Sequence, residues 1–214
     1  MTTEMIHETG QPASLRSGPW LGLSKARAIS GVAGKEARPA SDFYPTPPHA
    51  TKALLSVESF DGGIWEPACG QGHISEVLKE HGHEVTSTDL FDHGYGKPGI
   101  DFTKQFVTGV CANVVTNPPY NMAREFVDAG LLSANKKVAM LLKLSFLEGV
   151  TRKDWFQRTP LKCIYVFSRR ISLTRLGEPK LNKGMVSYAW FVWEHGYLGE
   201  PLIRWIDHCP NKVI

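Results

Sequence analysis

The sequence lacks the features that define several large classes of protein. No uninterrupted apolar run reaches the length of a membrane span, and the polar N-terminus lacks the apolar core of a signal peptide. The four cysteines lie far apart and form no CxxC pair, which argues against a disulfide framework and against a zinc site. We therefore expect reduced thiols, a cytoplasmic protein and no bound metal.

The size and composition indicate one ordinary domain with a full core. The chain has 214 residues, of which 42% are hydrophobic and 21% charged. Its formal net charge of +3 is compatible with a nucleic-acid partner but does not demonstrate one. Residues 1–40 have an irregular composition, and we expect a flexible arm there or, alternatively, a basic arm on a polyanion. Residues 41–214 are expected to form the domain.

Strand-like and helix-like segments alternate from residue 42 onward. We predict strands at 62–68, 84–90, 112–117, 136–144, 162–168 and 186–195, and helices at 49–57, 73–82, 121–135 and 146–158. Residues 201–206 are either a short extra strand or a packed tail. This alternation is typical of an α/β fold with a mostly parallel sheet. The last two predicted long strands have no helix between them, which predicts an antiparallel hairpin at one edge of the sheet.

The segment WEPACGQGH predicts a ligand site at the end of the first strand. Gly70 and Gly72 open a helix and allow a ligand to approach the backbone closely. Glu66, shortly before this turn, would repel a diphosphate but would suit an ammonium group. Asp89 ends the following strand, where an acid can bind ribose hydroxyls. A nucleoside with a zwitterionic end fits these residues, and S-adenosylmethionine is such a molecule.

The motif NPPY forms a stiff corner after a predicted buried strand. Pro118 and Pro119 lack a backbone donor and therefore end the strand. Ligands of open α/β sheets bind beyond the strand ends, and there Asn117 and Tyr120 would suit a planar ligand with an amino group. The alternative is a rigid turn with a capping asparagine and a core tyrosine.

These motifs together resemble class I S-adenosylmethionine-dependent methyltransferases of the DNA adenine-N6 kind. The matching segments, in the family's order, are FYPTP (43–47), EPACGQG (66–72), TDL (88–90), DF (101–102) and NPPY (117–120). The segments LKLSFLEG and AWFVW resemble those of small phage-type members. The resemblance implies a Rossmann-like methyltransferase fold, S-adenosylmethionine as cofactor, and adenine-specific DNA methylation in the cytoplasm of a bacterium or of a phage's host.

The resemblance also implies roles for individual residues. The expected cofactor-binding residues are Tyr44, Thr46, Pro47, Glu66, Ala68, Gly70, Gly72, Asp89, Leu90, Asp101 and Phe102. For Asp101 a loop cap is the alternative role. The Asn117 side chain and the Pro118 carbonyl would accept the two hydrogens of the target amine, with Pro119 completing the corner. Tyr120 would stack on a flipped base, and no covalent cysteine intermediate is required.

The resemblance leaves target recognition to a short basic connection. No segment is long enough for a separate recognition domain, whereas residues 169–184 carry five basic side chains against one acidic one. The basic residues are Arg169, Arg170, Arg175, Lys180 and Lys183. They predict phosphate contacts to duplex DNA and a short recognition site or weak sequence specificity. A solvated edge hairpin is the alternative. We expect a monomer or a weak dimer.

Two further questions stay open at the level of sequence. Relatives often sandwich the target base with an aromatic residue after the sixth strand, but residues 168–173 contain none. An aliphatic residue of this segment, Phe146 or Tyr188 could serve instead. The aromatic residues of 190–193 are expected in the core, because they alternate along a strand. The substrate alternatives are RNA adenine and, less expected, a protein glutamine. A catalytically inactive nucleic-acid-binding module is a further alternative, against which the intact motifs argue.

Overall fold

The computed structural model describes residues 44–105, 107–173 and 186–207. The predicted arm, residues 1–40, lies outside these ranges. So do Arg175, Lys180 and Lys183 of the predicted nucleic-acid contacts. The predictions for these residues stay predictions.

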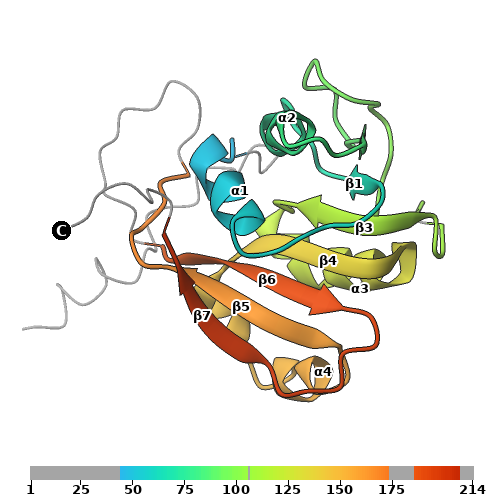
Figure 1. The fold of residues 1–214 in the computed structure, drawn as a ribbon. Coiled ribbons are helices and arrows are strands. Elements are labelled where there is room, and N and C mark those ends of the chain that lie inside the picture. Colours follow the sequence, from blue (N-terminus) through green and yellow to red (C-terminus); the bar gives the residue numbers. More distant parts are fainter. Residues whose placement is uncertain (1–43, 106, 174–185, 208–214) are drawn as a thin grey trace, which may run out of the picture. The chain divides into compact units, whose positions relative to one another are not determined.

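Seven strands form one sheet in the order β2-β1-β3-β4-β6-β5-β7 (Figure 1). Their bounds are β1 Ile64–Glu66, β2 Val85–Ser87, β3 Cys111–Thr116, β4 Ala134–Lys143, β5 Leu161–Phe167, β6 Tyr188–Glu194 and β7 Leu202–Ile206. All neighbours pair in parallel except β6, which is antiparallel to both β4 and β5. The predicted mostly parallel sheet with an antiparallel hairpin is thereby confirmed. The extra strand β7 pairs in parallel with β5 and is outermost.

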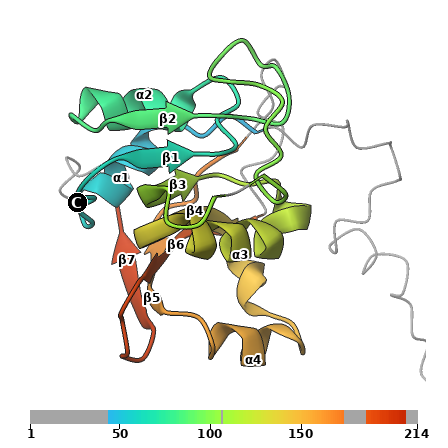
Figure 2. The same cartoon turned by 90° about the vertical axis from the view of Figure 1, so that its right-hand side faces the viewer.

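Helices cover both faces of the sheet (Figures 1 and 2). Helices α1 (Pro48–Leu55) and α2 (His73–Glu80) pack on one face, and α3 (Ala123–Ser133) packs on the other. The predicted helix 146–158 is wrong in its first part: a 3₁₀ turn η3 (Leu144–Leu147) precedes the short helix α4 (Arg152–Phe156). Gly149, with φ of +134°, interrupts the segment because that conformation cannot continue a helix. None of the helices in the described ranges is long and apolar enough to cross a membrane.

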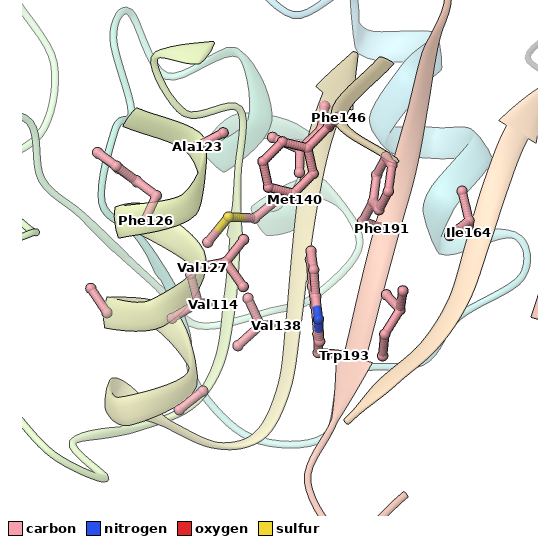
Figure 3. Packing of buried hydrophobic residues seen from close by; sticks show 14 of the residues in the cluster. Val114, Ala123, Phe126, Val127, Val138, Met140, Phe146, Ile164, Phe191 and Trp193 are labelled. Atoms are coloured by element: carbon pink, nitrogen blue, oxygen red, sulfur yellow. The ribbon is translucent and has the colours of Figure 1, made fainter. Parts of the chain in front are cut away.

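The strand alternation divides the core into two apolar layers. Val114, Met140 and Phe191 belong to the layer beneath α3, which Figure 3 shows from close by. Val115 and Trp190 belong to the layer beneath α1 and α2. Successive side chains of a strand point to opposite faces, so strands buried on both faces read as continuous apolar runs. The expectation that the aromatic residues of β6 belong to the core is confirmed.

The parallel strands end at one edge of the sheet, here termed the carboxyl edge. Strands β1, β2, β3, β4 and β5 all run toward it, whereas β6 begins there, because Tyr188 is the register partner of Lys143. The motifs singled out in the sequence follow the ends of β1, β2 and β3. The topology therefore brings them to the same edge, where open α/β sheets bind their ligands.

Candidate functional site

The amide of Asn117 is held by the segment that precedes α1. Its Nδ2 donates to Thr46 Oγ1 at 3.0 Å and to the Tyr44 carbonyl at 3.3 Å. A carbonyl oxygen can only accept, so the second bond fixes which way the amide faces. The opposite oxygen, Asn117 Oδ1, is buried and has no hydrogen-bond partner within the described residues. A buried acceptor without a partner is costly. This oxygen is therefore available to an N–H group of a ligand.

Aromatic rings surround the corner that follows Asn117. The Tyr120 ring centroid lies 6.4 Å from that of Tyr44, with 27° between the planes, and 5.6 Å from that of Tyr188, with 36° between the planes. The Lys143 ammonium lies 4.7 Å from the Tyr120 centroid. Of the two aromatic residues considered as a second base-stacking group, Tyr188 has this ring contact with Tyr120. Phe146 packs in the core against Trp155, Phe156 and Phe191.

The glycine turn is tied to the end of β2 through Asp89. Gly70, with φ of +51°, donates its backbone N–H to Asp89 Oδ2 at 2.9 Å, and the Phe91 N–H bonds to Asp89 Oδ1 at 2.9 Å. Each carboxylate oxygen retains a second lone pair for a ligand hydroxyl. Leu90 and Phe91, beside it, are 48% and 40% exposed. An acid next to exposed apolar side chains suits a nucleoside.

The second glycine of the turn has a neighbour that the sequence did not predict. Gly72 has φ of +84°, and a Cβ atom there would lie 2.6 Å from the ring of Tyr95. The Tyr95 hydroxyl donates to Glu76 at 2.5 Å and accepts from Lys79 at 2.7 Å. Gly72 is thus required for packing of the loop after β2. Its predicted contact with a cofactor stays a prediction.

Glu66 is more deeply buried than its predicted role requires. Glu66 is 1% exposed, and its carboxyl accepts a hydrogen bond from the Ser75 hydroxyl. The same hydroxyl is hydrogen-bonded to that of Ser87 at 2.6 Å. Burial raises the pKa of Glu66 to about 8, and the charge of Asp89 contributes to the rise. Near neutral pH the carboxyl is largely protonated in the structure described. Pairing with a ligand's ammonium group would require that proton to leave.

The contacts of Asp101 agree with its alternative role as a loop cap. Its Oδ1 accepts from the Thr103 N–H at 3.2 Å and from the Thr103 hydroxyl at 2.7 Å, and Lys104 Nζ pairs with its Oδ2 at 2.8 Å. The hydrogen bond from Lys104 is the largest cause that lowers the pKa of Asp101. Phe102 is 1% exposed and packs on Trp65, and its predicted place beside the cofactor stays a prediction.

The remaining predicted residues lie along the carboxyl edge or just beneath it. Ala68 follows β1 and is half-buried, and Pro47 directly precedes α1. Pro118 is buried within the corner between β3 and the 3₁₀ turn η2 (Tyr120–Met122). Arg169 and Arg170 are exposed just beyond the end of β5. The described part of the predicted phosphate-contacting segment therefore lies at the same edge of the sheet as Asn117.

Comparisons with known proteins agree on the architecture. No family model matches this sequence, and no curated protein is significantly similar to it. Solved structures are similar at low identity. A candidate RNA methyltransferase from Pyrococcus horikoshii is 17% identical, with a TM-score of 0.57, over 79% of this chain and 96% of that one. The modification subunit of a candidate type I restriction enzyme from Vibrio vulnificus is 12% identical, with a TM-score of 0.53, over 86% of this chain and 50% of that one.

The chain has the class I methyltransferase fold. The similarity extends to proteins described in other terms: a candidate hemolysin from Lactococcus lactis is 11% identical, with a TM-score of 0.51, over 72% of this chain and 89% of that one. Because one fold supports many activities, the substrate has to be argued from the site.

Proposed function

We propose that this chain is an adenine-specific DNA methyltransferase, which transfers a methyl group from S-adenosylmethionine to the N6 amine of adenine. The observation that carries the proposal is the buried Oδ1 of Asn117, which has no partner in the described part of the chain and is held in place by Thr46 and the Tyr44 carbonyl. An acceptor beside aromatic rings matches a planar base with an exocyclic amine.

The residues at the ends of β1 and β2 suit the proposed cofactor. Asp89 offers free lone pairs for ribose hydroxyls, and Leu90 and Phe91 offer apolar surface for a base. The cofactor, when bound, supplies an electrophilic methyl group. The glycine turn at Gly70 keeps side-chain atoms away from the backbone on which such a ligand would rest.

The chain's own contribution to the chemistry is positioning and electrostatics. The N6 amine of adenine is a weak nucleophile because its lone pair is delocalised into the ring. Asn117 Oδ1 and the Pro118 carbonyl would each accept a hydrogen bond from the amine. These bonds would offset the positive charge that develops on the nitrogen. A thiolate is not required, and burial raises the pKa of Cys69 to about 12 and that of Cys111 to about 11. Both thiols therefore stay protonated near neutral pH.

The target base would lie against the tyrosines. Tyr120 and Tyr188 offer aromatic faces next to Asn117, and base–aromatic stacking tolerates any sequence. A base inside a duplex cannot reach this edge, so the mechanism includes base flipping. Arg169 and Arg170, with the predicted contacts outside the described residues, would bind the backbone on either side.

RNA adenine is the second candidate substrate. The similarity to the candidate RNA methyltransferase, at a TM-score of 0.57, favours it, and the chemistry at Asn117 would be the same. A glutamine side chain has an amide nitrogen but no ring. With such a substrate the aromatic rings around Tyr120 would have no base to stack on, so glutamine is the least favoured substrate.

The test is methyl transfer from labelled S-adenosylmethionine to unmethylated duplex DNA, single-stranded DNA and total RNA in parallel, followed by nucleoside mass spectrometry. N6-methyladenine in DNA is the expected product. Label in RNA alone would keep the chemistry of Asn117 but change the substrate. If folded protein transferred label to none of the three nucleic acids, that result would contradict the proposal.

A further inference from the structure

Three lysines of the described residues are half-buried, Lys137, Lys143 and Lys162. Lys143 differs from the other two in its partners. Lys137 bonds to Glu58 at 2.7 Å, and Lys162 bonds to Glu194 at 2.6 Å. In the described part of the chain, no carboxylate pairs with Lys143, whose ammonium lies instead over the Tyr120 ring at 4.7 Å. A partly desolvated ammonium is stabilised by an anion, so this position suits an anionic ligand group.

The position of Lys143 points to the substrate side of the site. It is the last residue of β4, and its register partner is Tyr188, which also contacts Tyr120. Strand β3 separates β4 from β1, so the glycine turn after β1 and Asp89 after β2 lie on the other side of Asn117. Neighbouring strands are about 4.8 Å apart, so β4 lies about 10 Å from β1. The anion therefore belongs to the group that occupies the tyrosine side.

We propose that Lys143 binds a backbone phosphate of the target nucleotide while the base lies against Tyr120. This inference rests on the proposed function and deepens it. A cation near an amine that becomes positively charged would hinder methyl transfer unless an anion neutralised it. A nucleotide carries such an anion next to its base, whereas a glutamine side chain and a free nucleoside do not. Lys143 thus selects for a polynucleotide without reading its sequence.

The chain offers a matched control on the same strand. Lys136 is exposed near the start of β4, whereas Lys143 ends it. Seven residues of strand place the two roughly 23 Å apart. Lys136→Gln and Lys143→Gln therefore make the same change in charge at opposite edges of the sheet. Lys143→Arg keeps the charge and the cation–aromatic contact.

Binding of each protein to single-stranded oligodeoxyadenylate is measured by fluorescence anisotropy at increasing salt. Bases of this probe need no flipping, and the measurement does not depend on methyl transfer. Each phosphate contact contributes about 0.7 to the slope of log Kd against log salt for a single strand, so Lys143→Gln should lower the slope by about that much. At low salt its affinity should fall about tenfold, as expected for a hydrogen bond to a charged group. Lys136→Gln and Lys143→Arg should keep the wild-type slope.

A second probe identifies the anion. On an oligomer with an uncharged methylphosphonate backbone, Lys143→Gln should bind as well as the wild type. A wild-type slope for Lys143→Gln would overturn the inference. So would a rise in KM for S-adenosylmethionine with unchanged DNA binding, because the cofactor carboxylate would then be the anion. Wild-type protein that binds with the lysine-dependent slope but forms no N6-methyladenine would contradict the proposed function alone.

Discussion

Replacing Asn117 with alanine should separate catalysis from stability. The side chain donates two hydrogen bonds, to Thr46 Oγ1 at 3.0 Å and to the Tyr44 carbonyl at 3.3 Å. It also buries one acceptor, Oδ1, that has no partner within the described residues. Asn117→Ala removes both features at once. Their contributions to the free energy of unfolding have opposite signs.

The two contributions nearly cancel in stability but not in activity. Two hydrogen bonds are worth about 1 kcal/mol each, and an unsatisfied buried acceptor costs about 1–3 kcal/mol. The free energy of unfolding of Asn117→Ala should therefore lie within about 1 kcal/mol of the wild type. By contrast, removing one preorganised group that stabilises transition-state charge lowers kcat by about 10²–10³-fold. Only catalysis should be severely affected.

Two measurements test this prediction, urea unfolding and the kcat for formation of N6-methyladenine. Thr46→Val is the matched control, because it removes one bond to the amide and leaves Oδ1 in place. It should lose about 1 kcal/mol of stability, with a smaller loss of kcat than Asn117→Ala. Asn117→Ala with a kcat within a few-fold of the wild type would refute the proposed role of the oxygen. A loss of stability well above 1 kcal/mol would contradict the expected cancellation.

Three further changes should act mainly on stability. Gly72→Ala should cost more than Gly82→Ala, by about 1–3 kcal/mol in urea unfolding: both glycines have positive φ, but only at Gly72 would a Cβ lie 2.6 Å from the Tyr95 ring. Glu66 has its folded pKa raised to about 8, so its carboxyl destabilises the fold progressively as pH rises from about 4.5 to 8. Glu66→Gln should therefore gain stability relative to the wild type over that window, by at most about 1.4 kcal/mol per pH unit, and equal pH profiles would contradict this. Glu58→Gln should lose about 1.5–3 kcal/mol, because the half-buried Lys137 would then keep only the carboxylate of Glu194, 3.7 Å away, and a loss below about 0.5 kcal/mol would contradict the ion-pair account.

The fold was predictable because nearly every element has a strong local pattern. The buried strands β3, β4 and β6 read as apolar runs, and their alternate residues fill the two layers of the core. The segment 146–158 was mispredicted because its apolar spacing resembles a helix. Gly149 interrupts it, and Arg152 donates to the carbonyls of Phe146 at 3.0 Å and Glu148 at 2.9 Å, which satisfies the turn without helical bonds. Such a side-chain cap has no signature in the apolar spacing of the segment.

The positions of the candidate site residues at the strand ends were predictable, but their contacts were not. The placement of Asn117 and Asp89 at strand ends follows from periodicity and topology. The choice between Phe146 and Tyr188 does not, because it depends on the register of β6 against β4, which pairs Lys143 with Tyr188. The sequence likewise gave no sign that the Tyr95 ring covers Gly72, since the two lie on segments joined only by tertiary packing.

The acceptor geometry at Asn117 depends on chain segments that are distant in sequence. The amide is held by Thr46, which directly precedes Pro47 and helix α1. Helix α1 is fixed to the sheet in turn, because the buried Trp190 indole donates to the Ala50 carbonyl at 2.9 Å. The first bond is partly buried and the second fully buried, and hydrogen bonds shielded from water are stronger and their loss more costly. A catalytic effect that relies on positioning needs such support, since a misplacement of about 1 Å can cost on the order of a hundredfold in rate. Residues 44–46 are therefore structurally linked to the NPPY corner: the Tyr44 carbonyl and Thr46 Oγ1 hold the amide in the orientation that leaves Oδ1 without a partner among the described residues.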